Sequence, residues 1–215
     1  ERDAATSLHL TQIQLDPNWH SPPMHSSRLD LALTTMLESH GLNQGKAGRG
    51  FEATHVTSVA MIVADYGFDE DTVIAALLHD TLEDTDLDPE VIRSRFGGLV
   101  LATVQDVSEP KKPRPWRDRK EAYIKQLQST PRESALAVAS ADKIHNLSNM
   151  THGLMKQRLT FIKSFTASLE EMVWYHKTVL ATLRNNWSHA ILEEHGQRNA
   201  AFLDTVTKLT DENHP

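Results

Sequence analysis

The sequence predicts an all-α fold, and three observations lead to that expectation. Apolar residues recur every three or four positions in successive segments, and glycine or proline stands where most of these patterns stop. No alternation of apolar and polar residues lasts for the length of a useful strand. The chain has 215 residues without a flexible linker, low-complexity tract or long repeat, so we expect a single domain with one substantial core.

The N-terminal region is predicted to contain an arm, a helix and a loop. Residues 1–27 are polar, contain several prolines and show no sustained period, which is typical of an irregular arm before a domain over residues 28–210. Apolar side chains over 29–37 predict a first helix that Gly41 ends. The glycine-rich segment 43–51 is then expected to be a loop of the kind that often lines a site.

Two antiparallel helices are expected to follow this loop. From Thr54, apolar residues recur at helical spacing until Gly67, and Asp69 caps the next predicted helix. Because the connection is short, the two helices are predicted to be antiparallel neighbours. His55 begins the first helix and His79 ends the second, so the two histidines are expected at the same end of the pair.

Capping signals predict two further helix starts. Asp88 and Pro89 supply an N-cap and a favourable first helical residue for a short helix. Residues 130–133, Thr-Pro-Arg-Glu, have the pattern of a capping box for a longer helix. That helix carries Asp142 and Asn146 four positions apart, and therefore on one face.

Two amphipathic helices complete the prediction, over roughly residues 156–184 and 188–209. Four of their aromatic side chains are expected in the core: Phe161, Phe165, Trp174 and Tyr175. For Trp174 and Tyr175, a core role is preferred to base stacking. Together, the predicted helices are expected to form a helical bundle.

The composition restricts the chemistry that the chain can perform. The absence of cysteine excludes a disulfide framework and a thiolate metal site. A metal would therefore be held by imidazole and carboxylate groups, which suit manganese, iron or zinc, while histidine ligands argue against magnesium alone.

Charge and hydropathy restrict the partners. The net charge of -7 argues against a broad nucleic-acid surface. No apolar stretch reaches the roughly 20 residues that span a bilayer, and no signal-peptide pattern opens the sequence, so a cytoplasmic protein without a membrane partner is expected. The sequence leaves the oligomeric state open, and a homo-oligomer is compatible with it.

The most informative stretch is residues 75–84, Ala-Ala-Leu-Leu-His-Asp-Thr-Leu-Glu-Asp, where an apolar helical run ends in four polar groups. Burying such groups beside a core is costly unless a cation or a reaction compensates. A His-Asp pair alone proves little, since about one is expected by chance in such a chain. The case depends on His55 upstream and on Asp142 downstream, which would complete a set of ligands.

Two imidazoles and two carboxylates from three helices can hold one octahedral cation and leave positions for water and a substrate oxygen. The candidate metal ligands are His55, His79, Asp80 and Asp142, and the two acids that could orient or deprotonate water are Glu83 and Asp84. If the helix of His79 continues, Glu83 lies one turn further along it. This arrangement favours hydrolysis of a phosphate ester.

Several neighbouring residues have two interpretations. The basic segment 111–120 is either a solvated charge run or a local anion site, and its position between ligand segments favours a phosphate site. Lys143 either neutralises phosphate or pairs with an acid, and Asn146 is expected to face the site. His145 points about 100° away from Asn146 along the helix and is expected to support the site or the core, not to bind metal.

These residues resemble the HD superfamily of metal-dependent phosphohydrolases, and specifically the hydrolase domain of RelA/SpoT homologues in its free-standing, small alarmone hydrolase form. The resemblance covers roughly residues 42–184. Its elements here are His55, the run Ala75–Asp84, Phe96-Gly97, the segment 115–123 and the segment Ala141–Asn146.

The resemblance implies an all-α HD domain with a Mn2+ site between its helices, or a site for another divalent metal, formed by the four candidate ligands. It also implies that Glu83 and Asp84 activate water and that Asn146 lies by the substrate ribose or the metal. The implied reaction removes the 3′-pyrophosphate from a nucleotide alarmone such as (p)ppGpp. The phosphate contacts that it implies are Arg117, Arg119 and Lys120. Lys46, which retains a basic position, and Lys143 are further candidate substrate contacts.

The sequence departs from the family pattern where the base would bind. Residues 46–56 retain only Lys46 as a clear basic position, and Ser148-Asn149 replaces an Arg-Thr-like pair. Guanine selectivity is therefore open, and adenine alarmones and NADPH remain alternatives. The other interpretations are an HD phosphohydrolase that acts on other nucleotides and an HD protein that binds nucleotides without catalysis.

Overall fold

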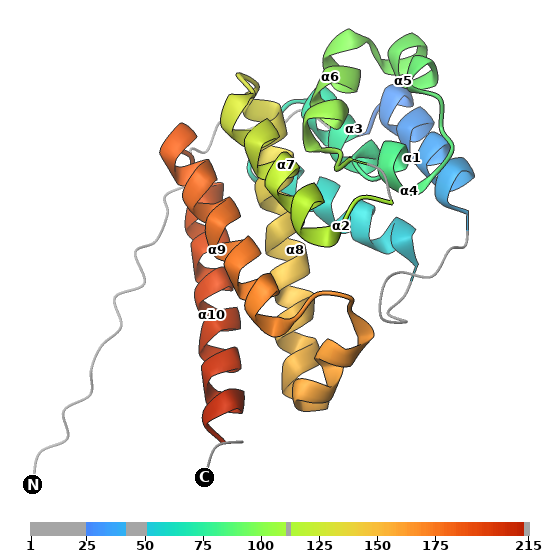
Figure 1. Ribbon diagram of the computed structural model, residues 1–215. Helices are drawn as coiled ribbons and strands as arrows, with labels where there is room; N and C mark the ends of the chain where they lie inside the picture. The colour runs from blue at the N-terminus through green and yellow to red at the C-terminus, as the bar shows by residue number, and fades with distance from the viewer. Residues whose placement is uncertain (1–24, 42–50, 111–112, 213–215) are drawn as a thin grey trace, which may run out of the picture.

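The computed structural model describes residues 25–41, 51–110 and 113–212, and every secondary-structure element within these ranges is helical. The prediction of an all-α fold is therefore confirmed. The elements, labelled in Figure 1, are α1 (Ser27–His40), α2 (Glu52–Asp65), α3 (Glu70–Leu78), α4 (Thr81–Asp84), α5 (Pro89–Phe96), α6 (Gly98–Val107), α7 (Trp116–Ser129), α8 (Glu133–Gln157), the 3-10 helix η2 (Arg158–Ser164), α9 (Leu169–Asn186) and α10 (Ile191–Asp211). Most of the expected arm 1–27, most of the expected loop 43–51 and Lys46 lie outside the described residues.

The first three helices follow the sequence closely. Ser26 caps α1 by accepting a hydrogen bond from the Leu29 amide over 3.1 Å, and Gly41, with φ +56°, ends the helix. The antiparallel pair of α2 and α3 is confirmed, with Gly67 in the turn at φ +77°. Asp69 caps α3 by accepting a hydrogen bond from the Thr72 amide over 2.9 Å.

α8 is the central helix of the molecule. It contacts α2, α3 and α6 on one side and α9, α10 and η2 on the other, as Figure 1 shows. Its first half is rich in alanine, and residues 135–141 are fully buried or nearly so. Small side chains allow the neighbouring helices to approach closely, which brings residues of α2 and α3 next to the α8 backbone.

Two apolar clusters share α8. The larger one joins α1 to α6 with the first half of α8 and parts of α7, α9 and α10, and the smaller one joins the second half of α8 to η2, α9 and α10. Phe161 and Tyr175 are buried as expected, whereas Phe165 and Trp174 are only partly buried against these clusters. No described helix has both the length and the apolar character that a membrane crossing requires.

The prediction of one helix over residues 156–184 is wrong in its first part. α8 continues to Gln157 and stops where Arg158 takes φ +55°, and η2 follows. α9 starts only after Ser168, whose side chain forms a capping box with Glu171. This second cap starts a new helix at Leu169, and the amphipathic pattern over 156–184 does not reveal it.

Two other local expectations are also wrong. Thr130 does not cap α8: its hydroxyl accepts from the Arg132 amide over 3.2 Å and donates to Asp106, so Arg132 stands at the N-cap without a side-chain bond. The helix of His79 does not continue either. α3 ends at Leu78, and a turn at His79 and Asp80 separates it from α4.

Candidate metal centre and the charged groups around it

The four candidate ligands come from three parts of the fold, and the structure brings them together. His55 is in the first turn of α2, His79 and Asp80 form the turn after α3, and Asp142 projects from α8. The Nε2 atom of His55 lies 3.5 Å from Oδ2 of Asp80 and 3.3 Å from Oδ1 of Asp142. These four residues are called the ligand quartet below.

The antiparallel packing of α2 and α3 accounts for the meeting of the two histidines. Their ring centroids lie 5.2 Å apart, and His79 Nε2 lies 3.2 Å from Oδ1 of Asp80. One ligand atom from each of His55, His79 and Asp80 lies within 4.8 Å of the others, which is close enough to share one ion.

The environment of His79 fits a metal ligand. Its Nδ1 lies 2.8 Å from the carbonyl oxygen of Ala76, so the ring N–H must be on that side to donate to it. The other nitrogen, Nε2, is buried and has no hydrogen-bond partner among the described residues. A histidine whose second nitrogen is fixed by a carbonyl and whose lone pair faces a carboxylate is typical of metal sites.

Asp142 is held as a carboxylate by a pair of neighbours on its own helix. Lys143 and Asn146 donate to its two oxygens. Burial raises the pKa of Asp142, but the charge of Lys143 and the hydrogen bond from His55 outweigh this and hold the pKa well below its usual range. The structure therefore places Lys143 in an ion pair, and Asn146 faces the site as expected.

His145 contacts the site but not as a member of the ligand quartet. Its Nδ1 lies 2.7 Å from Nδ1 of His55, and the side-chain amide nitrogen of Asn149 lies 3.3 Å from the His145 ring nitrogens. Burial lowers the pKa of His55, but the hydrogen bond with Asp142 and the charge of Asp80 raise it above its ordinary value.

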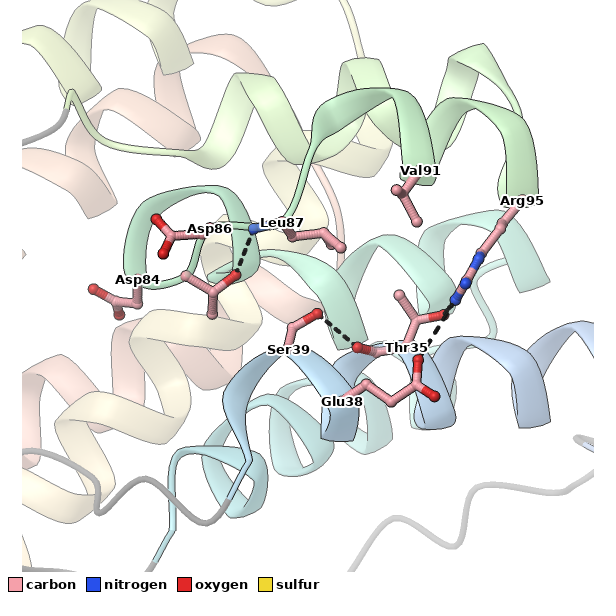
Figure 2. Close-up of a pocket in the computed structure, with 9 residues that line it drawn as sticks. Thr35, Glu38, Ser39, Asp84, Asp86, Leu87, Val91 and Arg95 are labelled. Atoms are coloured by element: carbon pink, nitrogen blue, oxygen red, sulfur yellow. Dashed lines mark hydrogen bonds and ion pairs between the residues drawn. The ribbon is translucent and has the colours of Figure 1, made fainter.

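Glu83 and Asp84 are on the short helix α4, directly after the turn of His79 and Asp80. Oε2 of Glu83 accepts a hydrogen bond of 3.3 Å from the backbone amide of Glu109. Asp84 lines a cleft of about 520 Å³ between α1 and the segment from α4 to α5. Figure 2 shows Asp84 and Asp86 at one end of this cleft and Arg95 at the other, with Glu38 of α1 beside Arg95.

Residues 116–120 of the predicted basic segment form the first turn of α7 and the start of its second, and their cations differ in their surroundings. Arg119 and Lys120 of α7 both donate to the buried carboxylate of Glu109, and Arg119 Nη1 also lies 3.9 Å from Oε1 of Glu83. Burial lowers the pKa of Lys120, although the charge of Glu109 opposes it. These four residues, Glu83, Glu109, Arg119 and Lys120, are called the charged cluster below.

Arg117 occupies a different position from the cations of the charged cluster. Its guanidinium carbon lies 3.2 Å from the centre of the Trp174 ring, and Nε donates to Glu121 over 2.8 Å. The structure brings together the ligand quartet, Lys143 and Asn146 through direct contacts, and it links Glu83 to Arg119 and Lys120 through Glu109.

Glu109 is the residue near the site that the sequence analysis missed. A single acid immediately before a basic segment is a weak signal, but it is the only carboxylate between Asp106 and Asp118. Its side chain is 7% exposed, and ordinary surface acids in such segments are solvated.

The model of the HD domain family matches residues 32–167 of this chain. The chain is 33% identical over 129 residues to a guanosine-3′,5′-bis(diphosphate) 3′-pyrophosphohydrolase of Aquifex aeolicus, which covers 60% of the chain and 18% of that protein. It is 30% identical over 131 residues to the bifunctional (p)ppGpp synthase/hydrolase SpoT of Escherichia coli K12, covering 59% of the chain and 18% of SpoT. The chain thus spans under a fifth of the length of these relatives.

Two solved structures have the same fold. A metazoan orthologue of SpoT, described as hydrolysing ppGpp, superposes with a TM-score of 0.64 at 23% identity, covering 88% of this chain and 97% of that one. The protein lmo0812 of Listeria monocytogenes EGD-e gives a TM-score of 0.64 at 26% identity and covers 70% of this chain and 99% of its own. All members of the ligand quartet lie within residues 32–167, and the chain belongs to the HD domain family, with homology to SpoT- and RelA-type (p)ppGpp hydrolases.

Proposed function

We propose that this protein is a metal-dependent hydrolase that removes the 3′-pyrophosphate from nucleotide alarmones such as (p)ppGpp. The observation that carries the proposal is the meeting of the ligand quartet from α2, the turn after α3, and α8, with Glu83 on the adjoining helix. The names of the Aquifex and Escherichia relatives, which are 33% and 30% identical to this chain over the matched parts, support the choice of substrate.

The ligand quartet is proposed to hold Mn2+, and another divalent metal is the alternative. When bound, such a cation would polarise a phosphate group and acidify a water molecule. Imidazole and carboxylate donors suit manganese, and the chain has no thiolate that would favour a softer metal.

The chain's own residues are proposed to handle the water and its protons. Glu83 accepts a proton from a water molecule that attacks the phosphorus atom bonded to the 3′ oxygen, and Asp84 helps to orient that water. The bond between this phosphorus and the 3′ oxygen breaks, and the 3′ oxygen takes up a proton. The products are pyrophosphate and GDP or GTP.

The proposed substrate contacts are cations and one amide. Arg119 and Lys120 would attract the phosphate groups from α7, and Asn146 would lie beside the ribose or the metal. Lys143 would add positive charge from α8. Lys46 and Arg117 are retained as proposed contacts, and residues 28–210 are proposed to act as one hydrolase domain, preceded by the arm 1–27.

A release assay with purified protein tests the function. Pyrophosphate or phosphate is measured from ppGpp, ppApp, NADPH, GTP and dGTP with Mn2+, and an EDTA sample is the control. Release from ppGpp or ppApp, lost with EDTA, supports the proposal and sets the base preference. Activity on the other nucleotides alone would replace it with another phosphohydrolase, and no activity on any would favour a nucleotide-binding protein.

A further inference from the structure

The first turn of α2 carries the ligand histidine His55, but this turn has no side-chain cap. Phe51 stands at the N-cap, and its side chain offers no acceptor to the first amides of the helix. Helix ends fray more readily than the middle of a helix. A ligand in this position therefore needs another contact that fixes the backbone of its turn.

His40, the last residue of α1, supplies such a contact. Its Nδ1 lies 3.3 Å from Oε2 of Glu52, the first residue of α2, and the ring is the donor because an ionised carboxylate only accepts. The side chain of His40 is 1% exposed and that of Glu52 is 25% exposed. The other ring nitrogen, Nε2, is buried without a hydrogen-bond partner within the described part of the chain. The buried ring is thus directed at Glu52 through Nδ1.

Glu52 transmits this contact to His55. The two residues are three positions apart and therefore lie on neighbouring parts of one helix face. Nε2 of His55 lies 3.3 Å from Oδ1 of Asp142 and 3.5 Å from Oδ2 of Asp80. A rotation or loosening of the first turn would change both distances, so the geometry of the ligand quartet depends on how this turn is held.

α1 is itself held firmly enough to act as the anchor. Arg28, near its start, donates to Glu70 and Asp71 of α3. Further along the helix, Thr35 accepts a hydrogen bond of 2.8 Å from Arg95 of α5. Since α3 leads directly into the turn with two members of the ligand quartet, the contact between α1 and α2 ties His55 to the same framework.

We propose that His40 is a positioning residue for the metal centre. Through Glu52 it fixes the first turn of α2 against α1 and so presents His55 to the metal. The inference rests on the proposed function, in which the ligand quartet holds a divalent cation. The role requires a hydrogen-bond donor at position 40, and it does not require a charge there.

Isothermal titration calorimetry with Mn2+ tests this role. His40→Leu keeps a side chain of similar size in the buried position but removes the donor, and it is expected to raise the Kd about three- to tenfold, the range that one hydrogen bond accounts for. His40→Asn places an amide N–H near the position of Nδ1 and is expected to recover most of the affinity. An unchanged Kd in His40→Leu, or an equal loss in both variants, would overturn the inference.

Changes at Glu52 and Ser39 separate this contact from general effects on the fold. Glu52→Ala removes the same hydrogen bond from its more exposed side, is expected to raise the Kd as much, and takes the place of His40→Leu if that variant does not fold. The two changes together are expected to weaken binding no more than either alone, because they remove one interaction, and independent, multiplying losses would contradict the proposal. Ser39→Ala is the control and is expected to leave the Kd unchanged, since the hydroxyl of Ser39 donates to the Thr35 carbonyl within α1 over 2.7 Å.

Amide hydrogen exchange of the metal-free protein tests the same contact without metal or substrate. The amides of residues 54–58 are expected to exchange faster in His40→Leu than in the wild type, and as slowly as the wild type in His40→Asn. Equal exchange in all three proteins would overturn the inference. A wild type that releases no pyrophosphate would instead contradict the proposed function, and the exchange rates would still decide the role of His40.

Discussion

The Nδ1 atoms of His55 and His145 lie 2.7 Å apart, so one of the two rings must donate a proton to the other. This contact fixes the ring of His55 with its Nε2 toward Asp80 and Asp142. Such a partner on the far side of a ligand histidine orients the ring and tunes its basicity. His145 thus supports the ligand quartet from outside it.

We predict that His145→Ala weakens Mn2+ binding about tenfold or more, the range found for residues that support metal ligands. Isothermal titration calorimetry measures the Kd directly and requires no substrate. His152→Ala, an exposed histidine on the same helix, is the control and is expected to bind Mn2+ as the wild type does. Equal affinity in both variants would contradict the supporting role of His145.

A second prediction separates metal binding from proton transfer. Asp80→Ala or His79→Ala is expected to abolish both metal binding and turnover, because each removes a member of the ligand quartet. Glu83→Gln is expected to bind Mn2+ normally and to lose about 10²- to 10⁴-fold in kcat, the usual contribution of a general base. Full activity of Glu83→Gln would remove Glu83 from the mechanism.

The meeting of His55 and His79 could be predicted from the sequence because a short turn between two amphipathic helices leaves little freedom in their packing. The helical period placed Asp142 and Asn146 on one face of α8, but the contact of Asp142 with His55 depends on the packing of α8 against α2. The cations of the basic segment could not be assigned in this way. Their surroundings depend on Glu109, which is ten residues or more from them in sequence and reaches them only through the packing of α7.

The local errors have a similar origin. Thr130 and Ser168 are both plausible caps by composition, yet only Ser168 forms a capping box, since Asp106 of α6 competes for the hydroxyl of Thr130. α3 stops at the turn of His79 and Asp80, and the contacts of this turn with His55 of α2 exist only in the folded chain. Competition from a distant element is not encoded in a local pattern.

The two cations that were treated alike in the sequence are expected to differ in solution. Lys120→Ala is predicted to raise KM for ppGpp more than it lowers kcat, because Lys120 lies in the charged cluster beside Glu83. Arg117→Ala is predicted to change KM less, since its guanidinium is engaged by Trp174 and Glu121. Steady-state kinetics under Mn2+ checks both, and an unchanged KM in Lys120→Ala would return that residue to a structural role.

Two buried histidines outside the site predict a dependence of stability on pH. Burial lowers the pKa of His176 and of His195 to about 3. The unfolded chain, with an ordinary pKa near 6.5, then binds more protons than the folded protein between about pH 3 and 6.5. Stability therefore falls as the pH drops through that window, by up to about 1.4 kcal/mol per pH unit for each histidine.

Urea unfolding at pH 7 and pH 5 measures this loss. The His176 ring lies against Phe202, and a phenylalanine in its place cannot be protonated. His176→Phe is therefore expected to reduce the difference in unfolding free energy between the two pH values. The raised pKa of His55 acts in the opposite direction, because its stabilising charge is lost as the pH rises. A pH dependence identical in the wild type and in His176→Phe would contradict the prediction.

A last prediction concerns the close approach of η2 to α8. A Cβ atom on Gly153 would lie 2.6 Å from the ring of Phe161, which is 1% exposed and cannot turn outward without opening the smaller apolar cluster. Overpacking of this kind costs about 1–3 kcal/mol. Gly153→Ala is therefore expected to be destabilised by that amount.

Gly98→Ala is the matched control, because its Cβ would meet nothing nearer than 4.0 Å and alanine favours the helix. Thermal or urea unfolding compares the two. Equal stability would mean that η2 can move away from α8 at little cost, and that the smaller cluster is less tightly packed than the contact between Gly153 and Phe161 implies.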